Sequence, residues 1–160
     1  QKEENKFRQQ QIKKRAEELK KLIEKLEKNT LSNRIEKSIN LSEFKNMLPV
    51  GKLSIEKIKT AKPETGILLS LKKDSILKAP KEALVVYADN FKGYGNMVIL
   101  DLGNNYHLIF SGLSNILCKT GDWVQKGVVL GDISSSIKNS LYMEVRFKGK
   151  PINPSKWLRS

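Results

Sequence analysis

Histidine and cysteine are almost absent from this sequence, which contains one of each among its 160 residues. A single cysteine cannot form an internal disulfide. A catalytic zinc ion needs about three nitrogen, sulfur or oxygen ligands from the protein, and His107 and Cys118 are the sole imidazole and thiol in the sequence. A Ser-His-Asp triad would depend on His107, and no G-x-S-x-G motif is present. The composition therefore argues against the common hydrolytic centres.

Long apolar runs are missing as well. No stretch approaches roughly 18 consecutive apolar residues, so the sequence predicts no membrane-spanning helix. The chain starts at Gln1 without a basic and apolar leader, and we expect any export signal or anchor to lie upstream of that residue.

Negative charge is scarce, since 17 acidic side chains stand against 30 basic ones and the net charge is +13. Such an excess suits nucleic acid. However, Lys outnumbers Arg 25 to 5, whereas proteins that read bases and phosphates favour the bidentate Arg guanidinium. No helix-turn-helix, zinc-finger or aromatic stacking motif is present either. We therefore expect no nucleic-acid partner, and the basic surface suits an acidic protein, an anionic lipid or a cell-wall polymer equally well.

The first part of the chain is predicted to be helical. It has no Gly or Pro over residues 1–29, and Ile12, Leu19 and Leu26 recur every seven residues, as at the end of a coiled coil. A second amphipathic helix is expected within residues 31–45, as a regulatory segment or a simple connector. We therefore divide the chain into a helical coiled-coil segment, 1–45, and a second domain, 46–160.

The second domain is predicted to be a β structure. From residue 48 onward, Gly and Pro separate short β-branched runs such as "ALVVYA", "NMVILDLG" and "LYMEVRF". Regularly spaced strands with little helical periodicity between them indicate a two-sheet β-sandwich or barrel. In "LGNNYHL", Asn104 and Asn105 suit the positive φ of a tight hairpin turn.

Three stretches together resemble a known family. They are "KGYGNMVILDLGNNY" (92–106), "KTGDWVQKGVVLGDI" (119–133), with its G-x-x-V-x-x-G-x-x-L pattern, and "LYMEVRFKGKPINPSKWL" (141–158). The sequence from about Leu48 to Leu158 resembles the LytM, or lysostaphin-type, metallopeptidase domain. It is most similar to the degenerate members represented by EnvC, the murein hydrolase activator.

The resemblance also implies where zinc chemistry has been lost. Active members bind zinc through an H-x-G-x-D segment and the second His of an H-x-H segment, and use further histidines in catalysis. The corresponding positions here are Glu64, Leu68, Gly112, Ser140 and Tyr142. None carries the residue that the family requires, so we expect no enzyme activity, no metal and no cofactor.

His107 is the remaining histidine to consider. It alternates with Tyr106, Leu108 and Phe110, and Gly112 follows the phase of those residues, so a regular strand would point His107 away from the cleft. A new metal site built from His107, Cys118 and a carboxylate is an alternative that composition alone leaves open.

The resemblance implies that the cleft binds a protein. In EnvC-like proteins it binds a periplasmic N-acetylmuramyl-L-alanine amidase and promotes septal peptidoglycan hydrolysis in cell division. A coiled coil there transmits a signal from a membrane ABC-type division complex, and a regulatory helix covers the cleft until the signal arrives. We expect a periplasmic location. The residues expected to line the partner-binding cleft are Lys78, Tyr94, Phe110, Tyr142 and Arg146.

Other functions fit the same sequence. The domain would serve as a structural or peptidoglycan-binding module if the cleft holds a wall polymer in place of an amidase. A residual metallo-endopeptidase is the remaining alternative.

Overall fold

The structure, a computed structural model, describes residues 2–28, 55–60, 66–71, 74–134 and 140–153. A single long helix, α1 (Lys2–Lys28), precedes the strands in this part of the chain. The strands are β1 (Ile55–Thr60), β2 (Ile67–Leu71), β3 (Ser75–Lys78), β4 (Ala83–Phe91), β5 (Gly95–Gly103), β6 (Tyr106–Leu113), β7 (Asn115–Ile116), β8 (Trp123–Val124), β9 (Val129–Ile133), β10 (Ser140–Phe147) and β11 (Lys150–Pro151).

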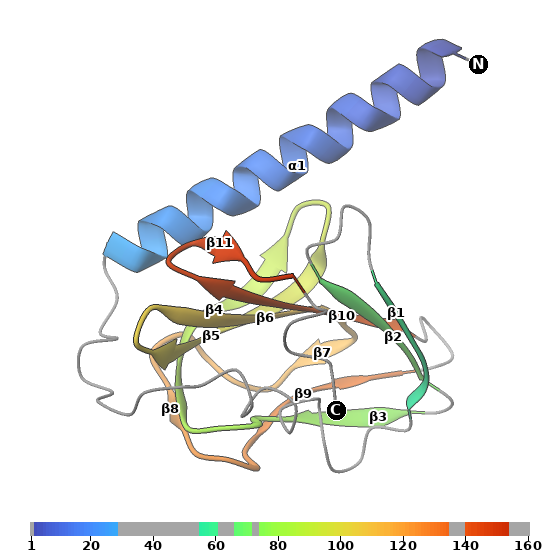
Figure 1. Ribbon diagram of the computed structural model, residues 1–160. Coiled ribbons are helices and arrows are strands. Elements are labelled where there is room, and N and C mark those ends of the chain that lie inside the picture. The colour runs from blue at the N-terminus through green and yellow to red at the C-terminus, as the bar shows by residue number, and fades with distance from the viewer. Residues whose placement is uncertain (1, 29–54, 61–65, 72–73, 135–139, 154–160) are drawn as a thin grey trace.

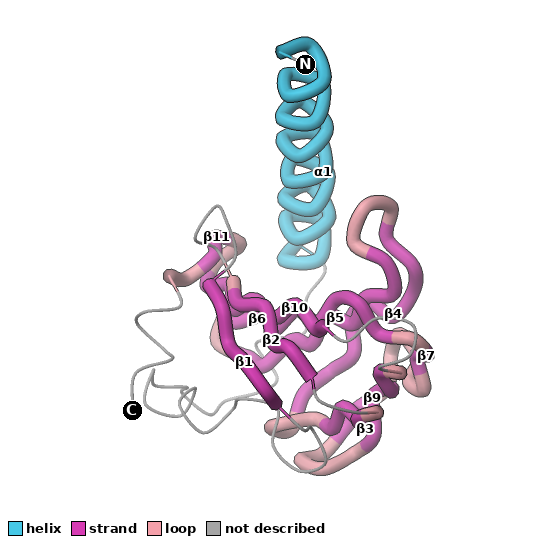
Figure 2. Tube along the Cα trace, turned by 90° about the vertical axis from the view of Figure 1, so that its right-hand side faces the viewer, coloured by secondary structure: helices cyan, strands magenta, loops and turns pink. Residues whose placement is uncertain are grey.

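The strands form two antiparallel sheets. The larger sheet has eight strands in the order β1-β2-β10-β6-β5-β4-β8, with β11 paired to β10, and the smaller has the order β3-β9-β7. The smaller sheet packs on one face of the larger sheet, and α1 lies over the opposite face (Figures 1 and 2). The predicted two-sheet β structure with an N-terminal helix is confirmed.

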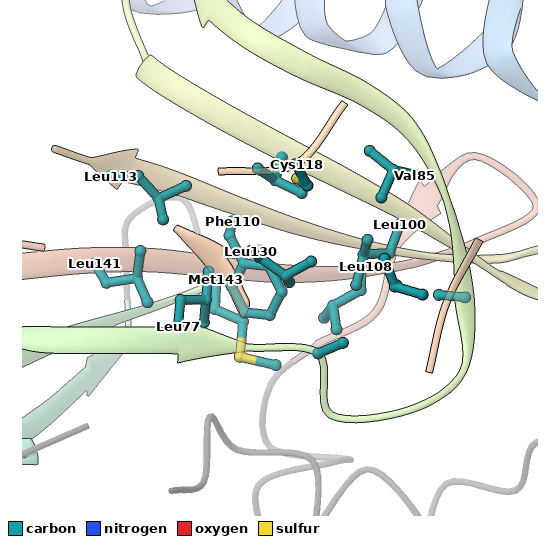
Figure 3. Packing of buried hydrophobic residues seen from close by; sticks show 14 of the residues in the cluster. Leu77, Val85, Leu100, Leu108, Phe110, Leu113, Cys118, Leu130, Leu141 and Met143 are labelled. Atoms are coloured by element: carbon teal, nitrogen blue, oxygen red, sulfur yellow. The ribbon is translucent and has the colours of Figure 1, made fainter. Parts of the chain in front are cut away.

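The main core lies between the two sheets. Alternate residues of β6 and β10 enter it, because successive side chains of a strand point to opposite faces. Phe110 pairs with Met143 across these strands, and both are fully buried. Figure 3 shows them packed with Leu77 and Leu130 of the smaller sheet. The prediction that Phe110 lines a binding cleft is therefore wrong, because its ring fills the core.

The turns that the sequence marked have the expected geometry. Asn104 and Asn105 join β5 to β6 with φ values of 51° and 69°, as a two-residue hairpin turn of this kind requires. In the segment after β7, Gly121 and Gly127 have positive φ and Val124 between them is buried. The predicted hairpin turn at Asn104 and Asn105 is confirmed.

Helix α1 uses its apolar residues to cover the sheet. Leu19 and Ile23 are 1% and 0% exposed and pack against Met97, Ile99 and Ile109 of β5 and β6, as well as partly buried neighbours. The N-terminal part of α1 extends beyond the strands (Figure 1). The helix is confirmed, whereas its pairing in a coiled coil stays a prediction. Within the described residues, no helix has the length and apolar content needed to cross a bilayer.

The seven-residue spacing of apolar residues in α1 does not ensure that each is buried, since Ile12 is 54% exposed. The predicted helix at 31–45 and the predicted boundary between 45 and 46 lie outside the described residues. The contact between α1 and the sheet nevertheless crosses that proposed division of the chain.

Candidate binding groove

The sheet face beneath α1 brings together four of the five positions at which the resemblance implies lost zinc-binding or catalytic residues. Tyr142 on β10 is the register partner of Leu68 on β2. Ser140 lies two residues before Tyr142 and therefore on the same face. A Cβ atom on Gly112 would lie 3.2 Å from the Ser140 carbonyl oxygen. Glu64 lies outside the described residues.

Tyr142 occupies the space next to the start of β2. A Cβ atom on Gly66 would come within 2.6 Å of the ring carbon Cζ, so the ring can lie there only because residue 66 is glycine. The Tyr142 hydroxyl donates a hydrogen bond of 2.6 Å to Glu144 Oε2. This hydroxyl is thus already committed to a carboxylate of its own strand.

Glu144 and Arg146 form a buried ion pair on the same face. Arg146 Nε donates to Glu144 Oε1 at 2.6 Å, and the two residues are 7% and 1% exposed. Arg146 Nη1 also donates to the Gly149 carbonyl at 2.9 Å. Arg146 therefore lies where the sequence placed it, but its guanidinium is engaged within the domain. The sequence analysis missed Glu144, although "YMEVR" places residues 142, 144 and 146 on one strand face.

A groove of about 400 Å³ lies beside these positions. The turn from β4 into β5, including Asn90, Tyr94 and Asn96, forms one wall, and the end of β6, including Gly112 and Ser114, forms the other. Its lining carries no charged side chain and combines three glycines with the polar side chains of Asn90, Asn96 and Ser114, the Tyr94 ring and Leu113. Its volume lies within the range typical of ligand-binding clefts.

Tyr94 connects this groove to both α1 and β10. Its carbonyl oxygen accepts a hydrogen bond from the Ser111 hydroxyl, and its ring packs at the edge of the cluster beneath α1. Burial raises the pKa of the Tyr94 hydroxyl, the Glu144 charge raises it further, and Arg146 and Arg15 oppose the increase. Tyr94 is therefore the predicted cleft residue that the structure places in a groove wall.

Lys78 is not part of this arrangement. It lies at the end of β3, pairs with Val129 and belongs to the smaller sheet. The smaller sheet packs on one face of the larger sheet, with the main core between the two sheets, whereas α1 packs on the other face. The prediction that Lys78 edges the same cleft as Arg146 is wrong, because sequence pattern does not reveal which sheet a strand joins.

The predicted orientation of His107 is also wrong. His107 is the register partner of Arg146. Arg146 lies four residues after Tyr142 on β10, so Arg146 and His107 are on the same face of the sheet as Tyr142. The reason is a bulge, since Asn96 pairs with Leu113 and Met97 with Ser111, leaving Gly112 as the additional residue with φ of 101°. A bulge shifts strand phase by one residue, so Gly112 does not share the phase of Phe110.

His107 is completely buried between Asp101 and Arg146 of the neighbouring strands. Within the described part of the chain, neither ring nitrogen has a hydrogen-bond partner. Burial lowers the pKa of His107 to about 4, and the nearby Arg146 charge acts in the same direction. The imidazole is therefore neutral in the folded protein at neutral pH.

This burial predicts acid sensitivity. The unfolded chain binds a proton at its ordinary pKa near 6.5, whereas the folded chain does so only near 4. Stability should therefore fall as pH decreases from about 6.5 to about 4, by about 3 kcal/mol in total. Replacing His107 with Leu should remove this part of the pH dependence, which urea unfolding of both proteins at several pH values would measure. Identical pH profiles for the two proteins would contradict the assignment.

The residues that the structure describes at these positions do not fit a zinc site. Leu68, at one implied ligand position, has no donor atom, and the Tyr142 hydroxyl, at another, is bonded to Glu144. His107 stands four residues along the strand from the Leu68–Tyr142 row, or about 13 Å at the usual rise. Among the residues that the structure describes, no three His, Cys, Asp or Glu side chains gather as a metal site requires.

The chain matches the model of peptidase family M23 over residues 62–154. The match covers more than half of the chain, and the chain belongs to this family. The fold agrees with that assignment.

Curated relatives include two proteins named murein hydrolase activators. The chain is 30% identical to NlpD of Escherichia coli over 96 residues, which are 58% of this chain and 25% of that protein. It is 27% identical to EnvC of Escherichia coli over 96 residues, which are 58% of this chain and 23% of that protein. An uncharacterized protein of Neisseria meningitidis serogroup B is 40% identical over 77 residues, 47% of this chain and 13% of that protein. The matched region thus spans a quarter or less of each relative.

Solved structures share the fold. The catalytic domain of lysostaphin from Staphylococcus simulans aligns with a TM-score of 0.52 and 17% identity, covering 77% of this chain and 100% of that chain. A zinc-containing peptidase from Vibrio cholerae aligns with a TM-score of 0.57 and 15% identity, covering 72% and 39%. At these identities the likeness concerns the fold alone.

Proposed function

We propose that this domain is a non-catalytic activator of a cell-wall hydrolase. The expected partner is a periplasmic N-acetylmuramyl-L-alanine amidase, bound at the groove beside Tyr94 and Gly112, with septal peptidoglycan hydrolysis as the outcome in cell division. One observation carries the proposal. Leu68 and Tyr142, at positions where the resemblance implies zinc ligands, do not fit a metal site, while the adjacent groove is open.

The named relatives support this choice. NlpD and EnvC are both named murein hydrolase activators, and the matched region of each aligns with 96 residues in and around the domain described above. A domain that retains the peptidase fold, with Leu68 and Tyr142 where the resemblance implies zinc ligands, suits recognition of another protein. Periplasmic location and the amidase partner are part of the same proposal.

Helix α1 supplies a means of control in this proposal. It packs on Met97, Ile99 and Ile109, and Ile109 is the register partner of Glu144 on β10. A helix in this position restricts access to the sheet face beside the groove. We expect an upstream partner, such as a membrane ABC-type division complex, to shift α1 and admit the amidase.

The test uses a groove variant with a matched surface control. Asn90→Arg adds a long charged side chain to the groove wall, and Gln125→Arg makes the same charge change at another exposed position. With a purified amidase from the same organism and dye-labelled sacculi, the wild-type protein should increase dye release. Asn90→Arg should reduce this stimulation by about tenfold, equivalent to 1.4 kcal/mol of binding energy, and Gln125→Arg should not.

The rival functions give different results in the same assay. Dye release by this protein without amidase would indicate a residual endopeptidase. Pelleting with sacculi without any stimulation of the amidase would indicate a wall-binding module. Either result would overturn the proposed activator function.

A further inference from the structure

Three side chains on one face of β10 connect segments that are distant in the sequence. Tyr142 lies against Gly66 at the start of β2, and Arg146 bonds the Gly149 carbonyl in the turn between β10 and β11. Glu144 stands between them and accepts a hydrogen bond from each. We propose that Tyr142, Glu144 and Arg146 act as one brace that positions β2 and the β10–β11 turn, and so shapes the groove face without a bound metal ion.

The hydrogen bonds make the three side chains a single unit. Both carboxylate oxygens of Glu144 are engaged, Oε2 by the Tyr142 hydroxyl and Oε1 by Arg146 Nε, each at 2.6 Å. Bonds to a charged group are stronger than neutral ones and strengthen further in a buried setting. Because a carboxylate held at both oxygens cannot rotate freely, a change at Tyr142 is transmitted to Arg146.

Steric fit at Gly66 fixes one end of the brace. A Cβ atom there would lie 2.6 Å from Tyr142 Cζ and 2.6 Å from the Met143 carbonyl oxygen. The Tyr142 ring therefore closes the space between β2 and β10 at this point. A side chain at residue 66 would separate the two strands or expel the ring.

The brace also reaches the groove wall. Tyr142 is the register partner of Ser111 on β6, and the Ser111 hydroxyl bonds the Tyr94 carbonyl oxygen. The Tyr94 hydroxyl lies within the electrostatic influence of both Glu144 and Arg146. Tyr142 and Glu144 are thus positioning residues for the groove, and this role belongs to the domain itself, whether or not it activates a hydrolase.

The decisive experiment follows glycine amide signals in an ¹⁵N-labelled sample. Tyr142→Phe removes one hydroxyl and keeps the ring. If the brace acts as a unit, the amide signals of both Gly66 and Gly149 will shift, although Tyr142 does not bond Gly149 directly. Tyr87→Phe is the matched control, because it removes a surface hydroxyl bonded to the Asn90 carbonyl, and it should leave both signals in place. An unchanged Gly149 signal in Tyr142→Phe would overturn the proposal.

Thermal unfolding provides a second readout that needs no amidase. Tyr142→Phe should lower Tm by about 3–6 °C, and Glu144→Gln should lower it more, because Arg146 then loses its counter-charge. A chelator such as EDTA should leave the wild-type Tm unchanged. If the chelator lowers Tm as much as Tyr142→Phe does, a bound metal ion stabilises the domain, which would overturn the proposal. The groove variant Asn90→Arg tests the activator function separately.

Discussion

Replacing both Leu19 and Ile23 with aspartate is expected to release α1 from the sheet. Each side chain is at most 1% exposed, and full burial of such a side chain contributes about 1.5–3 kcal/mol. Losing both should weaken helix docking by about 5 kcal/mol. The sheets should stay folded, because none of the described residues of the main core belongs to α1.

Limited trypsin digestion measures this release. The docked part of α1 contains Lys20, Lys21 and Lys25. Once the helix detaches and frays, the peptide bonds after these residues become accessible to trypsin. We expect cleavage within α1 to accelerate strongly while circular dichroism retains the strand signal. Ile12→Asp is the matched control, since Ile12 is 54% exposed and should not affect docking. Equal cleavage rates in the wild-type and double-variant proteins would contradict the docked helix.

The same double variant also tests control by α1. If the helix restricts the groove face, its release should raise amidase stimulation above that of the wild-type protein, as should deletion of residues 1–45. If α1 is merely a charged spacer, release should leave stimulation unchanged. The trypsin result and the stimulation result are independent, so docking and restraint can be separated.

Phe110→Ala is expected to destabilise the domain by about 3–5 kcal/mol, the usual cost of deleting a buried aromatic ring. Phe110 is fully buried among residues of both sheets (Figure 3), so its loss should leave a cavity. Urea unfolding followed by circular dichroism gives the change in unfolding free energy. The urea midpoint should fall sharply.

Phe147→Ala makes the same substitution at a partly exposed position. Phe147 is 36% exposed and contacts the Tyr106 ring at 4.7 Å between centroids, so its loss should cost only about 1 kcal/mol. Normal stability of Phe110→Ala together with loss of amidase stimulation would instead identify Phe110 as a contact residue. That result would contradict its place in the core.

Much of the fold was predictable from local pattern. The strands, the hairpin at Asn104 and Asn105, and the turns at Gly121 and Gly127 depend on backbone preferences of a few adjacent residues. The helical start depends on helix-forming residues without Gly or Pro. Such preferences act within short segments and can be read without knowing which strands pair.

The candidate site was only partly predictable. The sequence located Leu68, Ser140 and Tyr142, and the register places Leu68 opposite Tyr142. The sequence misplaced Phe110 and Lys78. Alternation along a strand does not reveal which face of the strand turns toward the core, nor which sheet the strand joins. The sequence also misplaced His107, because one additional residue at Gly112 reverses the phase and leaves no distinct mark in the sequence.

The sequence by itself determined that this chain has a helical start and a β domain, and its family resemblance predicted the loss of zinc-binding and catalytic residues. These properties depend on residue identity and short-range order. Tertiary structure alone decided that α1 covers the sheet, that Arg146 is paired with Glu144, and that the groove lies between the β4–β5 turn and the end of β6. Those contacts join residues far apart in the chain, and their free energy depends on packing and burial that exist only once the strands have paired.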